Sequence, residues 1–467
     1  MRIPFSLLLI IGGCLISLLS FGQQFSKSDL LADLQFMDSA FRYGHPMNLI
    51  ENPKIEFAPS IARVTKNLPD SISKIQYENV VREVLMEVHC SHTNVDSWSK
   101  VTPKKNVPTK FFPFYVFTDG HKIWILEKMN DSVQSTLQRG DEVLSINGHK
   151  TDSVLTILKN YHPQDGVGFD LSAQMINELF PPLFAKCIDR DSVFHVQSRN
   201  HEGKLVSTTE SGWVFKKKEE IDKEIDVLGN QAYFSLLKDT IGYLRISSIE
   251  SREQEFYDRV FQRIADRKLN YLVLDLRNNT GGSLFSSADL ISYFAADTCA
   301  FSITFPKQNM RPFISAHYRR KSRWNNFRWK LFKKFTYEKT QAGTRFTSVI
   351  YPKERLHFGG KIFVLTNGYT ASGSSFITAY AKHHAKAVVI GQKTGGGEFW
   401  NSAGIYAMIQ LPKSGLRIQT ATTHMQSDFP MKHFNGIEPD FPILYDPQTY
   451  GIRDLELETV FELIGTK

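Results

Sequence analysis

The C-terminal half of the sequence alternates between apolar, strand-like runs and amphipathic helical patterns. Ile241 to Ile249 and Tyr271 to Leu276 are strand-like, and a helical pattern from Arg252 to Ala265 separates them. Strands that alternate with helices predict an α/β fold with a parallel or mixed central sheet. Such sheets bind ligands at the carboxyl ends of their strands, so we expect the glycine-rich segment Arg277 to Ser283 to border a site.

A third strand-like run, Ile362 to Leu365, leads through a loop of small and polar residues into another helical pattern. We expect Ser374 or Ser375 to be the N-cap residue of this helix. Ser372 then lies on a tight strand-to-helix connection. A serine there can be presented at a cleft, with backbone N–H groups close enough to stabilise an oxyanion. Taken alone, the stretch is more typical of a turn that only caps a helix.

The segment 23–105 is predicted to be helical. One helical pattern spans Tyr77 to Val88 and is followed by the run His89-Cys90-Ser91-His92-Thr93. His92 therefore lies in a loop just past a helix, among small polar residues. Most lone histidines have structural roles, but this position makes His92 a candidate general base.

Residues 106–235 are predicted to form a β-rich module and a linker. Gly140-Asp141 is expected to form a turn, Val143 to Ile146 a strand, and Asn147-Gly148 a hairpin turn. This run resembles the corresponding part of PDZ domains, which bind peptide ends by adding a strand to a sheet. An ordinary hairpin is the alternative interpretation.

The first 22 residues have the pattern of a secretory signal. Arg2 supplies a positive charge, Phe5 to Phe21 is apolar, and small residues stand at the expected cleavage position. Lipidation at Cys14 ranks second, because a hydrophobic stretch would then remain after the cysteine. We therefore expect an exported protein, periplasmic or associated with the cell envelope.

The remaining cysteines and glycine-rich loops give no sign of a bound group. Cys90, Cys187 and Cys299 have neither the number of a disulfide framework nor the spacing of a metal site, although a single disulfide stays open. Gly281-Gly282 and Gly395 to Gly397 lack the lysine of a phosphate-binding loop. We therefore expect no metal and no cofactor.

One insertion carries much of the chain's net charge of +8. Residues 311–339 interrupt the strand–helix alternation with arginines and lysines that are interleaved with aromatic residues. We interpret them as a lid or flap that contacts an anionic membrane surface or an acidic substrate. A solvated helical insertion is an equal alternative. Nucleic acid is not expected as a partner of an exported chain.

Four stretches together resemble the core of the tail-specific (C-terminal-processing) serine proteases. In chain order they are Tyr271 to Gly282, Thr370-Ala371-Ser372, Ile390 to Gly395 and Gly436 to Asp440. The N-terminal helices that end in Ser91-His92-Thr93 and the PDZ-like module also fit members of this family. The resemblance implies a crotonase-like α/β protease core.

The chain is accordingly predicted to have four parts. They are a signal peptide at 1–22, an N-terminal helical region at 23–105, a PDZ-like module with its linker at 106–235, and a protease domain at 236–467.

The resemblance also implies roles for particular residues. Ser372, in the Thr-Ala-Ser motif, corresponds to the nucleophile. The lysine of the bacterial processing proteases would fall at Gly397, so this sequence departs from their Ser–Lys pattern, and Lys393 is not expected to substitute. The departure favours a branch that resembles the tricorn protease core, in which a histidine is the base. His92 matches that histidine, and a serine hydroxyl requires such a base.

The remaining site residues also follow from the resemblance. Glu438 lies in the segment near which the tricorn-type glutamate occurs, although His433 is closer to the aligned position of the acid. The oxyanion hole is expected to use backbone N–H groups of Gly373 and of Gly281 or Gly282.

The prediction is an exported serine peptidase that cleaves unfolded or C-terminal protein segments through an acyl-enzyme. Two alternatives stay open. A non-catalytic, peptide-binding relative of the same fold is suggested by the missing lysine. An esterase-like acyl hydrolase would use the same groups on another carbonyl. The sequence does not determine the oligomeric state.

Overall fold

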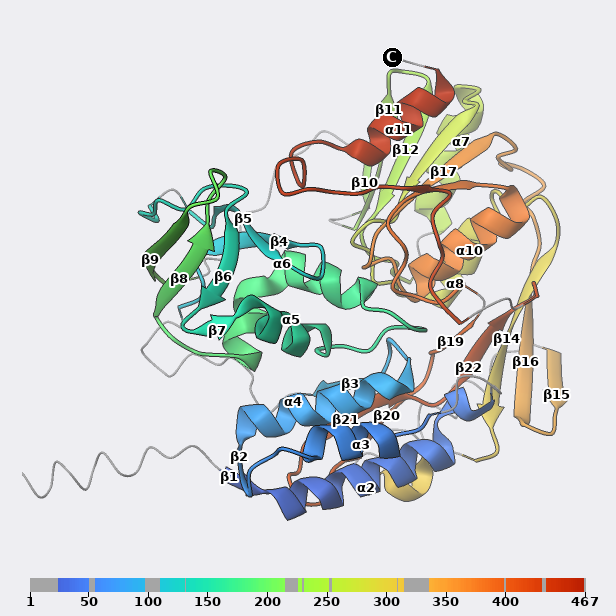
Figure 1. Ribbon diagram of the computed structural model, residues 1–467. Coiled ribbons are helices and arrows are strands. Elements are labelled where there is room, and N and C mark those ends of the chain that lie inside the picture. Colours follow the sequence, from blue (N-terminus) through green and yellow to red (C-terminus); the bar gives the residue numbers. More distant parts are fainter. Residues whose placement is uncertain are drawn as a thin grey trace, which may run out of the picture.

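The computed structural model describes residues 24–465, apart from 50–54, 97–109, 131, 215–225, 229–230, 252–253, 309, 315–335, 399 and 431–433 (Figure 1). The predicted signal peptide, His433 and most of the basic insertion 311–339 lie outside the described residues. Among the helices that are described, none combines the length and hydrophobicity that a membrane span requires.

The N-terminal region consists of helices joined by short strands. Ser73 caps α4 with a capping box, in which its hydroxyl accepts the N–H of Gln76 and the Gln76 side chain accepts the N–H of Ser73. His89, at φ 49°, ends the following 3₁₀ turn in the left-handed conformation. The elements are β1 (Gln24–Ser26), α2 (Lys27–Gly44), η1 (Pro46–Leu49), α3 (Ala58–Thr65), β2 (Ser71–Ser73), α4 (Lys74–Leu85) and η2 (Met86–Val88).

The middle region is a β-rich module with two helices. The predicted turn at Asn147-Gly148 is confirmed, because both residues have positive φ and join β6 to β7 as an antiparallel pair. The sheet has the order β4-β5-β6-β8-β9. Its elements are β4 (Phe114–Thr118), β5 (Ile123–Lys128), β6 (Glu142–Ile146), β7 (His149–Lys150), α5 (Thr151–Lys159), α6 (Asp170–Cys187), β8 (Val193–Arg199) and β9 (Leu205–Ser211). Its PDZ-like character stays a prediction.

A seven-stranded sheet forms the centre of the C-terminal half, in the order β10-β11-β12-β13-β17-β18-β23. The strands from β12 to β23 run parallel, which confirms the predicted α/β class. That the core is crotonase-like stays a prediction. The elements are β10 (Asp226–Leu228), β11 (Ala232–Leu237), β12 (Ile241–Ile246), α7 (Gln254–Asp266), β13 (Tyr271–Asp275), α8 (Leu284–Ile291), β17 (Lys361–Thr366), α10 (Gly373–Ala385), β18 (Val388–Gly391), β23 (Phe441–Pro442) and α11 (Leu455–Ile464).

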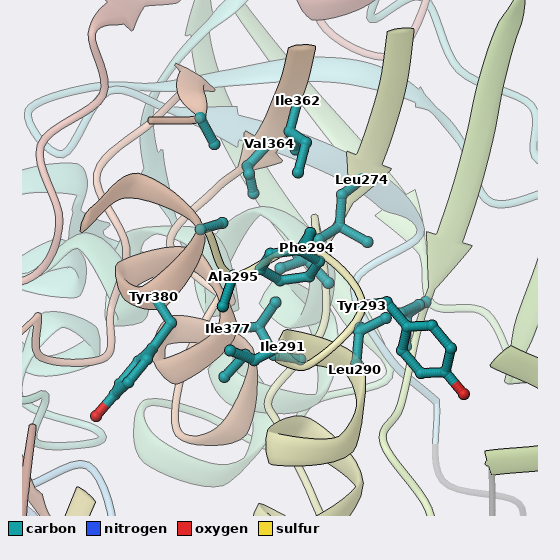
Figure 2. Packing of buried hydrophobic residues seen from close by; sticks show 14 of the residues in the cluster. Leu274, Leu290, Ile291, Tyr293, Phe294, Ala295, Ile362, Val364, Ile377 and Tyr380 are labelled. Atoms are coloured by element: carbon teal, nitrogen blue, oxygen red, sulfur yellow. The ribbon is translucent and has the colours of Figure 1, made fainter. Parts of the chain in front are cut away.

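The largest core lies between this sheet and helices α7, α8 and α10. Leu274 and Val364 point from neighbouring strands toward Ile291 of α8 and Ile377 of α10 (Figure 2). All four side chains are almost completely buried. Burying each such side chain stabilises the fold by roughly 1.5–3 kcal/mol. This packing fixes α10, and therefore the turn that precedes it, against the ends of β13 and β17.

Two further sheets are built from strands of the C-terminal half, and one of them also takes in a strand of the N-terminal region. One has the order β15-β16-β14-β22-β19, and the other β20-β21-β3. β3 comes from the N-terminal region, and its Val95 pairs with Ile418 of β21. Both side chains belong to a core that the N-terminal helices share with β20 and β21, which lie beside α4 in Figure 1. The elements are β3 (Asn94–Asp96), β14 (Cys299–Pro306), η3 (Arg311–Phe313), β15 (Thr336–Lys339), β16 (Gly343–Ile350), β19 (Trp400–Ser402), β20 (Tyr406–Gln410), β21 (Arg417–Ala421) and β22 (His424–Ser427).

This pairing has a direct consequence for the site. The His89-to-Thr93 loop immediately precedes β3, so the β3–β21 ladder holds it against the C-terminal half. The predicted domain boundaries stay predictions, and the basic insertion is described only at its two ends, by η3 and β15.

Candidate active site

Ser372 lies on a strained turn between β17 and α10. Its backbone has φ 56° and ψ −121°, a conformation that costs a non-glycine residue of the order of 1–3 kcal/mol. The expected N-cap at Ser374 or Ser375 is wrong, because α10 begins at Gly373 and Ser372 itself is the N-cap residue. Ser374 and Ser375 donate their hydroxyls to backbone carbonyls instead. The Ser372 hydroxyl makes no capping bond and remains available for other contacts.

His92 reaches this hydroxyl from the N-terminal region. Its Nε2 lies 3.0 Å from Ser372 Oγ, although the two residues are far apart in sequence. The Ser91 hydroxyl lies 3.4 Å from Nδ1, and the ring of Tyr406 stacks on the imidazole at a centroid distance of 5.9 Å. Burial lowers the pKa of His92, because a charged imidazolium is poorly solvated there. The ring is therefore neutral near pH 7, the form that accepts a proton.

Asp165 is the carboxylate beside His92, and sequence reasoning missed it. It lies on the loop between α5 and α6 and is fully buried. Its oxygens accept the N–H of Ser91 at 2.8 Å and that of Gly397 at 3.2 Å. Burial raises the pKa of Asp165, while its negative charge opposes the lowering of the His92 pKa. The loop matches no catalytic motif, so only the tertiary structure identifies this neighbour.

Glu438, predicted as the third site residue, lies elsewhere. Its carboxylate pairs with Lys393 Nζ at 3.2 Å, and 64% of its side chain is exposed. The two residues line a separate cavity. The structure therefore does not bring Glu438 to His92, because its side chain points toward a neighbouring lysine and solvent. Lys393, engaged in this pair, is likewise not placed at Ser372.

Gly397, where the lysine of the processing proteases would fall, is also beside this group. Its backbone N–H donates to Asp165. At this position the chain thus offers a hydrogen bond to a carboxylate in place of a basic side chain.

The predicted oxyanion loop packs directly against the Ser372 turn. A Cβ on Gly281 would lie 2.6 Å from the Gly373 nitrogen and 2.7 Å from the Ser372 Cβ, so no side chain fits there. The Gly281 N–H donates to Asn279 Oδ1 at 2.7 Å and is already engaged. Within the described part of the chain, the N–H groups of Gly282 and Gly373 have no protein acceptor. Gly282 and Gly373 are therefore the candidate oxyanion donors.

These groups open into a cavity of about 400 Å³. Ser372, Gly282 and Gly373 line one side of it, and apolar side chains line much of the rest. The apolar lining is contributed by Ile249, Leu284, Phe285, Ile303, Tyr406 and Met425. The cavity thus places a mostly apolar recess beside a serine, its hydrogen-bonded histidine and two N–H donors.

A second buried carboxylate, Asp275, lies at the end of β13. Arg277 donates to both of its oxygens, at 3.0 and 2.7 Å, and Arg245 contacts it at 2.9 Å. Burial would raise the pKa of Asp275, but the bonds and charges of the two arginines bring it below its usual value. Arg277 also bridges to Asp454, which precedes α11. The cluster therefore braces the glycine-rich loop.

Comparison with known proteins agrees with this picture. Residues 240–443, which contain Ser372 and the glycine-rich loop, match the family model of peptidase family S41. The comparison with curated proteins found no match.

Solved structures share the fold over most of the chain. Mature CPAF is 14% identical, with a TM-score of 0.63, and the match covers 94% of this chain and 97% of that one. Mature CPAF complexed with lactacystin is 15% identical, with a TM-score of 0.64, and covers 94% and 98%. The photosystem II D1 C-terminal processing protease is 14% identical, with a TM-score of 0.42, and the match covers 94% of this chain and 98% of that one.

Residues 240–443 are thus similar to peptidase family S41, and the solved structures share the fold of most of the chain.

Proposed function

We propose that the protein is an exported serine peptidase in which Ser372 is the nucleophile and His92 is the base. The observation that carries the proposal is the 3.0 Å contact between His92 Nε2 and Ser372 Oγ. A hydrogen bond of this length allows direct proton transfer. Its Ser–His pair follows the tricorn-like branch rather than the Ser–Lys branch.

The reaction would begin with attack of Ser372 Oγ on a peptide carbonyl as its proton passes to His92 Nε2. The N–H groups of Gly282 and Gly373 would stabilise the oxyanion, an effect worth about 3–4 kcal/mol per donor in other serine peptidases. The imidazolium would then protonate the leaving amine, leaving an acyl-enzyme. Water, deprotonated by the same histidine, would hydrolyse the acyl-enzyme.

Asp165 takes the place of the predicted Glu438 in this proposal. A buried negative charge beside His92 stabilises the imidazolium that forms during attack. Asp165 also holds the Ser91 N–H, so it positions the loop that carries the base.

The substrate is proposed to be an unfolded or C-terminal polypeptide segment, bound with a side chain in the apolar recess beside Ser372. The lid role of residues 311–339, with contact to an anionic surface, remains part of the proposal. The peptide-binding alternative keeps the fold without the chemistry, but the close Ser372–His92 contact favours the enzyme.

Peptide cleavage by the purified protein tests the proposal. Unfolded proteins and a peptide library are incubated with the wild type, Ser372→Ala and His92→Ala, and products are read by mass spectrometry. Ser207→Ala and His195→Ala are matched controls, because both residues are exposed on the β8–β9 hairpin. We expect cleavage by the wild type and both controls, with a loss of at least about 10³-fold in Ser372→Ala. Equal cleavage by Ser372→Ala and the wild type would refute the proposal.

A further inference from the structure

One buried cluster beside the proposed catalytic pair contains a group that the mechanism does not use. Cys90 Sγ, a ring nitrogen of His92 and a carboxylate oxygen of Asp165 lie within 4.8 Å of one another. Cys90 and Asp165 are fully buried. The spacing of the cysteines along the chain predicted no metal site, because the three residues converge only in the tertiary structure.

We propose that Cys90, His92 and Asp165 form a binding site for Zn²⁺, and that zinc bound there switches off the proposed base. Thiolate, imidazole and carboxylate are the three ligand types that Zn²⁺ takes from proteins. Zinc bonds of about 2.0–2.3 Å separate tetrahedral ligands by roughly 3–4 Å. The three donor atoms therefore need to close by only about an ångström.

Charge balance favours a divalent ion at this place. A thiolate and a carboxylate together carry two negative charges, so the complex with Zn²⁺ is neutral, and a neutral complex is inexpensive to bury. Without a metal, burial first and then the Asp165 charge raise the pKa of the Cys90 thiol, to about 12, and the thiol contacts the Ser402 carbonyl. A metal reverses this preference, because a coordinated thiol loses its proton.

The binding step balances as follows. Zn²⁺ replaces the thiol proton of Cys90, which passes to solvent, while Asp165 binds as the carboxylate and His92 as the neutral ring. One proton is released for each ion bound, so affinity rises with pH. The Ser91 hydroxyl, 3.4 Å from His92 Nδ1, or a water molecule can complete the coordination.

Zinc would inhibit the enzyme because a neutral imidazole carries only one proton. This inhibition rests on the proposed function, in which His92 is the base. His92 Nε2 faces Ser372, so Nδ1 is the nitrogen left for the metal. When zinc occupies Nδ1, the ring proton must reside on Nε2. Nε2 then donates to Ser372 and no longer accepts its proton. Occupation of Nε2 itself would displace Ser372, with the same result.

Cys187 provides a matched control. It is also buried, but the positive charges of Arg82, Lys186 and Arg190 outnumber the one negative charge, that of Glu78, and so disfavour a cation. If burial alone determined metal binding by a cysteine, replacing Cys187 would have the same effect as replacing Cys90.

Binding is tested without an activity assay, so that it can fail independently of the proposed function. The Ser372→Ala protein, which keeps all three ligands, is titrated with Co²⁺, and the ultraviolet charge-transfer absorption of a cobalt–thiolate bond is followed. We expect one equivalent to bind and to be displaced by Zn²⁺. The band should persist in Cys187→Ser and disappear in Cys90→Ser.

A variant in which Cys14, Cys187 and Cys299 are all replaced by serine covers the case in which Cys90→Ser fails to fold. It should retain the band, because Cys90 is then its only cysteine. Absence of the band from the parent protein or from this variant would overturn the site, as would its persistence in folded Cys90→Ser.

Inhibition is then measured as peptidase activity against buffered free Zn²⁺, with reversal by a chelator. Within each variant, activity with zinc is compared with activity without it. We expect the half-inhibitory concentration to rise at least about 10-fold in Cys90→Ser, since loss of a direct ligand costs at least as much as loss of an outer-shell partner. Cys187→Ser should match the wild type. Equal zinc sensitivity in Cys90→Ser would show that inhibition arises elsewhere.

Discussion

Asp165 and Asp275 are both fully buried carboxylates, yet only Asp275 has permanent positive charges around it. Two arginines neutralise Asp275, and their hydrogen bonds and charges lower its pKa despite burial. Asp165 has backbone N–H groups and a neutral histidine, and burial raises its pKa. A buried acid with permanent counter-charges is suited to bracing a loop. A buried acid whose neighbour becomes charged only during a reaction is suited to a catalytic role.

The contrast predicts that removing the Asp165 charge affects catalysis most. In Asp165→Asn the imidazolium formed during attack loses the negative charge that lies beside it. We expect kcat to fall by about 10²–10⁴-fold, as for other orienting carboxylates beside a catalytic histidine. Steady-state kinetics of peptide cleavage measures this. Thermal unfolding of the same sample checks that the variant is folded, and a fall in kcat below about 10-fold would remove Asp165 from the site.

The corresponding change at Asp275 is expected to affect stability instead. Asp275→Asn leaves Arg245 and Arg277 short of a buried partner, and breaking a buried ion pair typically costs about 3–5 kcal/mol. Denaturant unfolding should show that the free energy of unfolding falls by about 3 kcal/mol, the lower end of this range. The loss is expected to be this small because Arg277 keeps its ion pairs with Asp454 and Glu456.

Asp38→Asn is the surface control for this measurement. Asp38 pairs with Arg42 one turn along α2, and that arginine is 58% exposed. Such pairs contribute about 0.3–0.5 kcal/mol. If Asp275→Asn were no more destabilising than Asp38→Asn, the bracing role would be wrong.

The pH dependence sharpens the comparison further. His92 acts as a base only when neutral, and burial lowers its pKa below 6.5. The acid limb of kcat/KM should therefore fall below pH 6.5. Because the Asp165 charge raises the His92 pKa, the residual activity of Asp165→Asn should have its acid limb at still lower pH. A shift toward higher pH would contradict the coupling of these two groups.

The smallest effect is expected at Glu438. Its exposed pair with Lys393 should contribute only about 0–1 kcal/mol to stability. Glu438→Gln should accordingly cleave peptides within about 2-fold of the wild-type rate, because a surface pair of this size leaves the site intact. A loss comparable to that of Asp165→Asn would restore Glu438 as the acid.

The sequence was sufficient for the fold class, and it singled out Ser372 and His92, two residues that the structure brings into contact. Strand–helix alternation predicted the α/β core because apolar periodicity is a local property of the chain. Ser372 and His92 could be identified because each lies at an element end that a short motif marks. The structure places them in contact because β3 pairs with β21.

Other features depended on contacts that the sequence does not encode locally. Asp165 comes from a loop without a motif and meets Ser91 and Gly397 only in the folded chain. Glu438 has the right motif, but its side chain turns toward Lys393. The start of α10 was misplaced because the expected caps, Ser374 and Ser375, donate their hydroxyls to backbone carbonyls.

Covalent labelling of Ser372 by a fluorophosphonate tests the central claim most directly, because it requires an activated serine but no knowledge of the natural substrate. The labelled protein is digested, and the modified residue is located by mass spectrometry. The account predicts that Ser372 alone among the serines is labelled in the wild type. Labelling should persist in His195→Ala and disappear in His92→Ala. A folded wild type that is not labelled at Ser372, or a His92→Ala variant labelled at the wild-type rate, would contradict it.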